Sequence, residues 1–213
     1  MNIHTAAVPP FMKNGFVVSC EETREGVLID PGDEVEQLLA EARRARVKVL
    51  AILLTHAHFD HITGVGRAKG ELGVPVWLHK DDLFLYDAAE QQGAMFGLEV
   101  AAQPPVDRFY ADDTRYTFGR YTATPLPTPG HCPGGVCLAI GRDAGPATQL
   151  FVGDTLFAGS IGRTDLPGGN HATLIRSIRD VLFAFPDESV VHPGHGPDTT
   201  IGRERKTNPY LQE

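Results

Sequence analysis

Residues 53–61 read LLTHAHFDH, and this stretch places four side chains that can bind a metal within six positions: His56, His58, Asp60 and His61. It follows directly after the apolar run Val47–Leu54, which predicts a buried strand. Open α/β sheets hold their binding sites at the carboxyl ends of such strands. Because alternate side chains of an extended segment share a face, the first two histidines can reach one ion together. Asp60 and His61 follow where the chain must turn, and they can face a second ion.

The composition is that of an ordinary globular protein and sets limits on its partners. The 213 residues are 42% hydrophobic and 22% charged, which is enough to build a sizeable core. The formal net charge of −8 argues against a nucleic-acid or anionic-membrane partner, because either would need a basic face. No apolar run approaches the ~18–20 residues that cross a bilayer. Three cysteines without CxxC spacing and a first ten residues without a secretory signal lead us to expect a cytoplasmic protein.

The first half of the chain predicts strands that alternate with helices. The runs Phe16–Cys20 and Val27–Asp30 flank a polar turn and predict a hairpin. Apolar residues then recur at helical spacing from Glu34 to Arg46, with Asp33 as the expected N-cap. We further expect a strand over 74–78 and helices over 62–69 and 81–96. Gly64 lowers the stability of the first of these helices and suggests that another backbone packs close to it.

The second half predicts another set of the same kind. Its expected elements are a hairpin over 114–126, strands over 136–140, 149–152 and 189–191, and a helix over 171–184. No repeat and no shift in composition marks a boundary, so we expect a single domain over residues 1–213. Periodicity by itself gives an α/β chain with mixed sheets.

Three later segments each place one further ligand-type residue beside a strand or a turn. Residues 128–131 read TPGH, residues 151–154 read FVGD and residues 192–195 read HPGH. Each segment is weak evidence by itself, since a histidine on a loop is usually solvated. Their joint appearance behind residues 53–61 adds three candidate ligands: His131, Asp154 and His195. Seven ligands are more than one tetrahedral ion can use.

The HxHxDH pattern of residues 56–61, together with these three segments, resembles the signature of the metallo-β-lactamase superfamily over essentially the whole chain. The resemblance implies a four-layer αββα sandwich. It also implies one metal site formed by His56, His58 and His131, and a second formed by Asp60, His61 and His195. Asp154 then bridges both ions together with a water or hydroxide. Imidazole and carboxylate ligands without thiolate suit zinc, iron or manganese, and we expect two divalent ions, with zinc as the first candidate.

Such ions would supply the nucleophile of a hydrolase. A metal lowers the pKa of bound water from about 15.7 to about 7, so a metal-bound hydroxide forms at neutral pH and can attack an ester or thioester carbonyl. Asp60 is the candidate catalytic side chain, because it would lie beside the bridging water and could orient it or accept a proton. The lack of a thiolate argues against a β-lactamase proper, whose second site resembles Asp-Cys-His. Asp154 stands where that cysteine would be.

Two further stretches resemble one branch of this superfamily. Residues 153–165, GDTLFAGSIGRTD, look like the glyoxalase II (hydroxyacylglutathione hydrolase) family, and residues 199–210, TTIGRERKTNPY, look like its compact bacterial branch. This implies hydrolysis of small-molecule, glutathione-linked thioesters of the S-lactoylglutathione type to a hydroxy acid and a free thiol. Arg163 matches a basic glutathione contact of the family. We expect no C-terminal helical extension, and two tyrosines of the family are Asp165 and Pro197 here.

A second reading of the same residues is an oxygenase. The run Gly162–Asp165 also resembles the persulfide dioxygenases of this fold, which use one iron at positions that match His56, His131 and Asp154. Two histidines and one carboxylate with open positions are what oxygen activation requires. Both branches keep all seven ligands, so the ligand set does not separate them. The ending over residues 199–210 favours the hydrolase.

Four other histidines are expected to lie outside the site. We expect His4 in a mobile tail and His79 at a solvated helix start. His171 should be an exposed first-turn residue behind the N-cap Asn170, and His192 should be structural.

Overall fold

In the computed structural model, which describes residues 1–143 and 145–212, the chain forms two compact units. Unit 1 comprises Met1–Ala111 and Thr117–Tyr121. Unit 2 comprises Asp112–Tyr116 and the chain from Thr122 onward. The single domain over residues 1–213 stays a prediction.

Unit 1 is built on a sheet in which neighbouring strands follow the order β1-β2-β3-β4-β5-β6. These strands are β1 (Asn2–Ala6), β2 (Gly15–Ser19), β3 (Glu25–Ile29), β4 (Lys48–Leu53), β5 (Val76–Leu78) and β6 (Arg108–Phe109). The first three pair antiparallel, which confirms the predicted hairpin, whereas β3 to β6 pair in parallel. The strand predicted before residues 53–61 is confirmed as β4. Ile29 pairs with Leu53, so β3 and β4 end at the same edge of the sheet.

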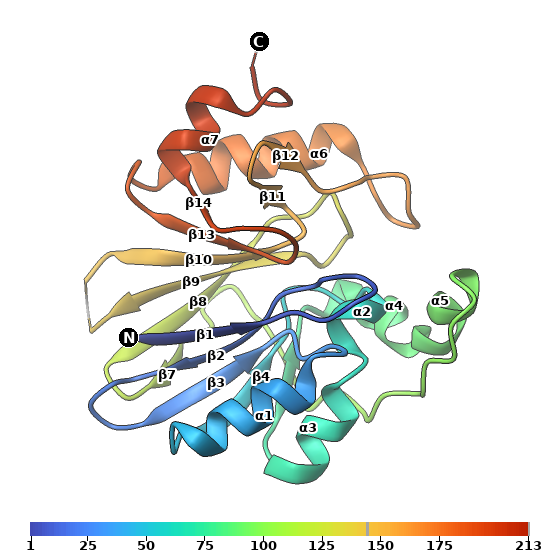
Figure 1. The fold of residues 1–213 in the computed structure, drawn as a ribbon. Coiled ribbons are helices and arrows are strands. Elements are labelled where there is room, and N and C mark those ends of the chain that lie inside the picture. Colours follow the sequence, from blue (N-terminus) through green and yellow to red (C-terminus); the bar gives the residue numbers. More distant parts are fainter. Residues whose placement is uncertain (144, 213) are drawn as a thin grey trace. The chain divides into compact units, whose positions relative to one another are not determined.

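Helices lie against one face of this sheet, where Figure 1 shows α1 and α3. The helices of unit 1 are α1 (Val35–Arg44), α2 (Phe59–Ile62), α3 (Val65–Leu72), η1 (Lys80–Asp82), α4 (Leu83–Asp87) and α5 (Ala89–Met95). The helical spacing predicted for α1 is confirmed, because its buried residues are Val35, Leu38, Leu39 and Ala42. The helices predicted over 62–69 and 81–96 are each divided into shorter pieces.

Two local predictions in unit 1 are wrong for the same reason, which is a tertiary contact. Asp33 is not the N-cap of α1. Glu34 holds that position, and the Asp33 carboxylate accepts a hydrogen bond of 2.7 Å from Thr63 Oγ1 instead. The predicted helix is interrupted near Gly64, where an added Cβ would overlap the carbonyl oxygen of Gly32. The close backbone approach that this glycine suggested is therefore present.

His4 does not lie in a mobile tail. It belongs to β1, where it pairs with Val17, and its Nδ1 lies 3.0 Å from Glu41 Oε1 of α1. A short strand of mixed polarity gives little sequence signal, because its stability comes from main-chain pairing with β2 rather than from its own side chains.

The second sheet has the strand order β14-β13-β10-β9-β8-β7, and a separate hairpin pairs β11 with β12. The strands are β7 (Tyr116–Phe118), β8 (Tyr121–Pro127), β9 (Val136–Arg142), β10 (Ala147–Gly153), β11 (Leu156–Phe157), β12 (Ser160–Ile161), β13 (Val190–Pro193) and β14 (Thr199–Thr200). The predicted strands are thus confirmed with small changes of their ends. β10 and β13 run parallel, and Gly153 pairs with Pro193. The residues that follow these two strands therefore emerge at the same edge.

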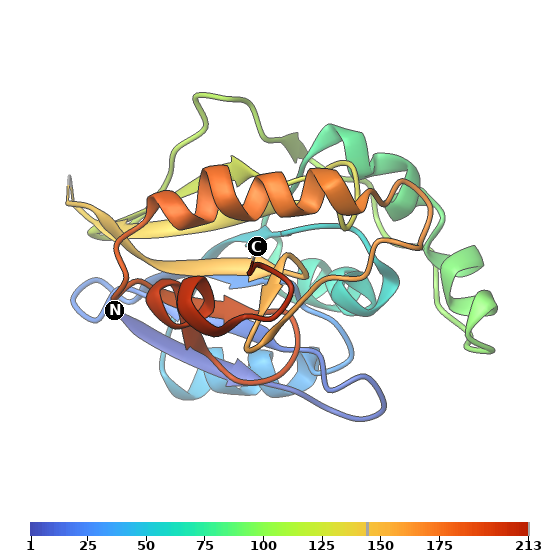
Figure 2. The same ribbon diagram turned by 90° about the horizontal axis from the view of Figure 1, so that it is seen from above.

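One continuous helical segment runs along β9 and β10 (Figure 2). It consists of α6 (His171–Arg176), a π-helical turn η2 (Ser177–Val181) and a 3₁₀ turn η3 (Leu182–Ala184), and it confirms the helix predicted over 171–184. Asn170 is its N-cap, as predicted, since Oδ1 accepts a hydrogen bond of 2.9 Å from Thr173 N. The C-terminal helix α7 (Ile201–Thr207) follows β14.

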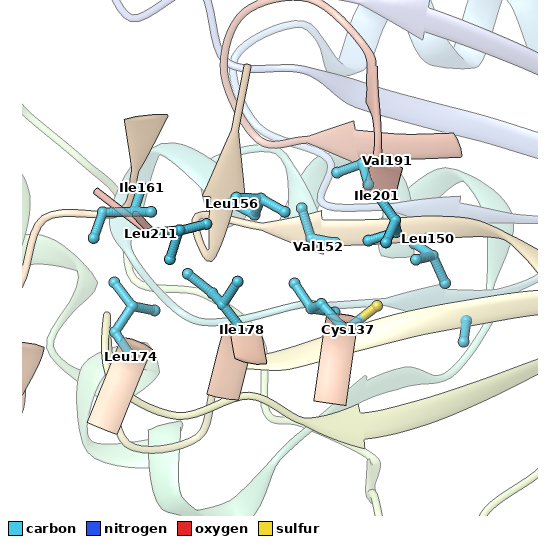
Figure 3. Close-up of a cluster of buried hydrophobic side chains, with 12 residues drawn as sticks. Cys137, Leu150, Val152, Leu156, Ile161, Leu174, Ile178, Val191, Ile201 and Leu211 are labelled. Carbon is cyan, nitrogen blue, oxygen red and sulfur yellow. The ribbon is translucent and has the colours of Figure 1, made fainter. Parts of the chain in front are cut away.

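These helices build the core of unit 2 (Figure 3). Leu174 and Ile178 from the helical segment pack with Val152 of β10 and Ile201 of α7, and all four side chains are at most 1% exposed. Val181, three positions after Ile178, is only half-buried. This core thus packs against β10, the strand that directly precedes Asp154.

The cysteines belong to the interior of the protein. All three are free and buried: Cys20, Cys132 and Cys137. Burial raises the pKa of the Cys137 thiol well above its ordinary value. Within residues 1–143 and 145–212, no helix has the length and apolarity needed to cross a membrane.

Replacing Ile178 by alanine should cost about 2–5 kcal/mol of unfolding free energy, because it removes a fully buried side chain from this core. Urea denaturation followed by circular dichroism measures the loss. Val181→Ala, on the same segment but half-buried, is the matched control and should cost clearly less. Equal losses in the two variants would show that the core does not centre on Ile178.

Candidate metal centre

Four candidate ligands of unit 1 gather where β4 ends. His56 and His58 lie in the turn that follows the strand, while Asp60 and His61 belong to the short helix α2. The His56 ring centroid lies 5.0 Å from that of His58 and 4.0 Å from that of His61. The Asp60 Oδ2 atom lies 3.9 Å from His61 Nε2. Exposure is 9% or less for each of the four side chains, so three imidazoles and a carboxylate share a largely dry corner of the sheet edge.

The Asp30 carboxylate fixes the orientation of His61. Asp30 directly follows β3 and is 1% exposed. Its Oδ1 accepts a hydrogen bond of 2.7 Å from Thr55 N, and its Oδ2 accepts one of 2.5 Å from Thr55 Oγ1. The same Oδ2 lies 3.0 Å from His61 Nδ1. If Nδ1 carries the proton, it donates to Asp30, and Nε2 is the nitrogen left to bind a metal.

A buried ion pair holds the turn that carries Asp30. The Lys13 ammonium contacts the main-chain oxygen of Asp30 and lies 2.6 Å from Glu34 Oε1, with both side chains at most 2% exposed. Glu34 Oε1 also accepts a hydrogen bond of 2.9 Å from Gly32 N. An added Cβ at Gly32 would overlap the carbonyl oxygen of Asp60, so only glycine lets this turn pack on the backbone of the ligand helix.

The three later candidate ligands also come together, within unit 2. His131 Nε2 and His195 Nε2 each lie 3.6 Å from the same oxygen, Asp154 Oδ2. This distance is too long for a hydrogen bond. Two ligands that bind one tetrahedral ion at ~2.1 Å lie about 3.4 Å apart. Each of the two distances therefore fits a histidine that shares a metal with Asp154.

Backbone groups fix His131 beside Asp154. His131 Nδ1 lies 2.7 Å from the carbonyl oxygen of Arg163, which orients the ring so that Nε2 turns towards the carboxylate. Gly162 allows this approach, because a Cβ there would overlap the carbonyl oxygen of Asp154 and lie 3.3 Å from His131 Nδ1. The edge of one ring in the Phe157–His195 pair meets the face of the other, at a centroid distance of 6.2 Å.

Arg163 meets the site through its backbone, whereas its side chain is exposed. The guanidinium makes two hydrogen bonds of 2.7 Å to the Asp165 carboxylate. This hydrogen bonding lowers the pKa of Asp165 to about 2. An exposed pair of this kind contributes little to stability, so the guanidinium can exchange Asp165 for another anion. Its role as a substrate contact stays a prediction.

Residues 199–210, the C-terminal stretch that contains α7, support the loop that leads to Arg163. Glu204 is fully buried and accepts hydrogen bonds from Thr199 Oγ1 at 2.6 Å and from Gly159 N at 2.9 Å. Asn208 Nδ2 donates to Glu204 Oε2 and to the carbonyl oxygen of Ser160, both at 2.9 Å. The β11–β12 hairpin is thus tied to α7.

Sequence reasoning missed three buried carboxylates that support these side chains. Asp30 holds His61, Glu204 holds the β11–β12 hairpin, and Asp82 Oδ2 accepts a hydrogen bond of 3.2 Å from the backbone of Ala57. The one available signal for Asp30 was its position directly after an apolar strand. That signal becomes informative only when β3 is known to pair in parallel with β4.

The donor chemistry of both sets fits a divalent transition metal. In unit 1, one ligand atom from each of Asp30, His56 and His61 lies within 4.8 Å of the other two, so the orienting carboxylate of Asp30 lies beside two of the candidate ligands. His56 Nδ1 lies 3.1 Å from Thr55 Oγ1, so this ring is also oriented through the nitrogen that would not bind metal. Oriented imidazoles and carboxylates of this kind suit zinc, iron or manganese.

Three of the remaining histidines lie in other surroundings. His79 begins η1, where Nδ1 accepts from Asp81 N at 3.3 Å, and it is half-buried rather than fully solvated. His171 is exposed in the first turn of α6. His192 is buried, stacks on Phe151 and has Nε2 2.8 Å from Gln149 Oε1, which is a packing role between β10 and β13.

The sequence matches the family model described as the metallo-beta-lactamase superfamily over residues 8–195. The chain belongs to this superfamily. All seven candidate ligands lie within the matched residues. The chain is therefore an enzyme of this superfamily, with His/Asp groups that could bind metal.

Curated relatives cover nearly the whole chain. A probable metallo-hydrolase, YqgX of Bacillus subtilis, is 37% identical over 206 residues, which are 96% of this chain and 94% of that protein. The hydroxyacylglutathione hydrolase GloC of Haemophilus influenzae is 35% identical over 218 residues, which cover 99% of this chain and 98% of that protein.

Solved structures of similar chains confirm the α/β fold class and the metallo-β-lactamase fold. The BLEG-1 B3 metallo-beta-lactamase has a TM-score of 0.89 and 35% identity, with full coverage of both chains. TTHA1623 in a di-iron-bound form has a TM-score of 0.85 and 42% identity, and covers 98% of this chain and 100% of its own. ETHE1 from Myxococcus xanthus has a TM-score of 0.77 and 27% identity, covering 98% and 84%.

Replacing Asp30 by asparagine should weaken metal binding about 10–100-fold, because the amide no longer holds His61 in its ligand orientation through a charge-assisted hydrogen bond. Competition with a chromophoric chelator measures the affinity. Asp33→Asn is the matched control, since that carboxylate is exposed and contacts Thr63 rather than a ligand. Equal affinities in the two variants would contradict the orienting role of Asp30.

Proposed function

We propose that this chain is a metal-dependent hydrolase of thioesters of the S-lactoylglutathione type, and that it releases a hydroxy acid and a free thiol. The observation that carries the proposal is the position of one Asp154 oxygen between the Nε2 atoms of two histidines, because it is the arrangement expected of a carboxylate that serves two metal sites. The hydroxyacylglutathione hydrolase GloC, 35% identical over nearly the full length, supports the substrate class.

The proposed centre combines the donors of both units. One ion would be held by His56, His58 and His131, and the other by Asp60, His61 and His195, with Asp154 serving both. The family match supports this combination, because it covers all seven residues. The di-iron form of TTHA1623, at 42% identity, supports two ions. Zinc is the first candidate, and iron and manganese suit the same ligands.

The chain's own residues have distinct parts in this hydrolysis. When bound, the ions lower the pKa of water to about 7 and polarise the thioester carbonyl. Asp30 and the Arg163 carbonyl keep two of the imidazoles oriented, so little reorganisation is needed during the reaction. Asp60 is the carboxylate that we assign to orient water or to accept its proton. The Arg163 guanidinium is assigned to bind an anionic part of a glutathione-linked substrate.

A persulfide dioxygenase is the second candidate. The run Gly162–Asp165, which resembles that branch, packs directly on His131 and Asp154, two of the three positions that would hold a single iron. Two histidines and one carboxylate leave positions open for oxygen and substrate. The cytoplasmic location expected from the cysteines and the N-terminus suits either reaction and stays a prediction.

We expect the purified protein to contain about two equivalents of zinc, or of zinc and iron together, and to cleave S-lactoylglutathione. Metal analysis by mass spectrometry, thiol release and oxygen uptake with glutathione persulfide form one set of measurements. A single iron with persulfide-dependent oxygen uptake and no thiol release would favour the dioxygenase. A β-lactam belongs in the same panel because of the similarity to BLEG-1.

Replacing Asp154 by alanine should remove both metal and activity, because one carboxylate would serve both ions. Metal content after gel filtration and the rate of thiol release test this. Asp165→Ala is the control for metal content, since that carboxylate is exposed and is hydrogen-bonded to the exposed Arg163 side chain. Full metal content in the Asp154 variant would refute the shared carboxylate.

A further inference from the structure

An aromatic cluster lies directly beside the metal-ligand turn of unit 1. Phe59 stands between His58 and Asp60 in the sequence, and its ring centroid lies 5.1 Å from those of Phe11 and Phe96. Phe11 comes from the loop between β1 and β2, and Phe96 follows α5, the helix that projects at the edge of unit 1 in Figure 1. Three segments far apart in the sequence thus bring apolar rings to the helix that carries two ligands.

The outer part of this cluster is exposed. Phe59 is 5% exposed, whereas Phe96 is 48%, Leu98 37%, Met12 52% and Met95 69% exposed. Single exposed apolar residues are common, whereas several large ones on neighbouring segments form a candidate binding surface.

A pocket of about 280 Å³ adjoins this surface, close to the lower end of the usual size of ligand sites. Phe59 forms one wall, Asp33 and Thr63 another, and the segment Leu98–Ala101 closes it. Phe59 therefore takes part both in the aromatic cluster and in the pocket.

Hydrogen bonds fix this wall to the ligand turn. Gln92 of α5 accepts a hydrogen bond of 3.3 Å from Phe59 N and donates to the carbonyl oxygens of Ala57 at 3.0 Å and Leu85 at 2.7 Å. A ligand in the pocket would thus contact Phe59, whose backbone Gln92 ties to that of Ala57, the residue between His56 and His58.

The charge around the pocket selects against anions. Its lining contains the carboxylates of Asp33 and Glu99, and it contains no lysine, arginine or histidine among the described residues. A negatively charged group such as a glutathione carboxylate would be repelled, whereas an uncharged apolar chain would bury its surface against Phe59 and Leu98.

We propose that this pocket, with the exposed rim of Phe96, Leu98 and Met95, is the subsite for the acyl chain of the thioester, and that it takes uncharged apolar acyl groups of about four to six carbons. The inference rests on the proposed hydrolase function and extends its acyl range. Besides lactoyl, the hydrolase then accepts acyl groups that are longer and less polar, while any anionic thiol carrier must extend away from this pocket.

Equilibrium binding tests the pocket without turnover. The as-purified protein is titrated by calorimetry with N-methylhexanamide, N-methylacetamide and hexanoate. We expect the hexanamide to bind most tightly, by up to about fourfold for each methylene that is fully buried. Phe96→Ala should weaken its binding about fivefold, since it removes a half-exposed ring that the chain would cover. Phe109→Ala, 44% exposed on the edge strand β6, is the matched control and should leave binding unchanged.

Charge gives a second readout. Glu99→Gln should tighten the binding of hexanoate about threefold and leave that of the hexanamide unchanged, because it removes one carboxylate from the lining. Equal binding of the two amides, or equal losses in the Phe96 and Phe109 variants, would overturn the proposal. A dimer in sedimentation that Phe96→Ala dissociates would also overturn it, since the surface would then be an interface between copies.

Cleavage of S-acetyl and S-hexanoyl N-acetylcysteamine separates this inference from the proposed function. A higher kcat/KM for the hexanoyl ester, lost in Phe96→Ala with the acetyl rate unchanged, supports both. Cleavage of the two esters at equal rates overturns the subsite and leaves the hydrolase standing. Cleavage of neither these esters nor S-lactoylglutathione, with amide binding that still depends on chain length and on Phe96, overturns the hydrolase while supporting the apolar preference of the pocket.

Discussion

The geometry of unit 1 depends on one buried carboxylate, that of Asp30. It joins the end of β3 to the end of β4 through Thr55, and it joins both to the ligand helix through His61. A carboxylate that is 1% exposed is costly unless hydrogen bonds replace its water shell, so these contacts are strongly favoured as a set. The Lys13–Glu34 pair beneath the same turn adds a second buried ionic contact. Removing one partner of such a pair leaves an uncompensated charge, which makes the turn intolerant of change.

Unit 2 also contains a buried carboxylate, but this one positions a loop rather than a ligand side chain. There the buried carboxylate is Glu204, and it contacts no candidate ligand. It holds Gly159, while Asn208 holds Ser160, and the hairpin formed by these residues leads to the Arg163 carbonyl that orients His131. This gives the C-terminal stretch over residues 199–210 a physical role. Its side chains take part in a hydrogen-bond network that holds this loop in place.

The parts of the fold that could be predicted are those that local sequence determines. The apolar run before residues 53–61 is a strand, the 3.6-residue spacing over 171–184 is a helical segment, and Asn170 is its N-cap. The candidate ligands could be named from the HxHxDH pattern of residues 56–61 and from the joint appearance of the three later segments behind it. Asp30 could not, since its importance arises only from the parallel pairing of β3 with β4. The same holds for the strand that contains His4, which exists because β2 is available to pair with it.

The short helix α2 shows that the positions of the candidate ligands Asp60 and His61 depend on tertiary contacts. It spans four residues, Phe59–Ile62, and a helix of one turn has no stability of its own. Among the contacts that hold it are Asp30 on His61, the Gly32 turn on the Asp60 backbone, and Gln92 on Phe59. Metal binding would add another contact and would draw on the same residues, so metal affinity and the stability of this corner must change together. A substitution that loosens any of the three contacts therefore weakens the site even where it removes no ligand.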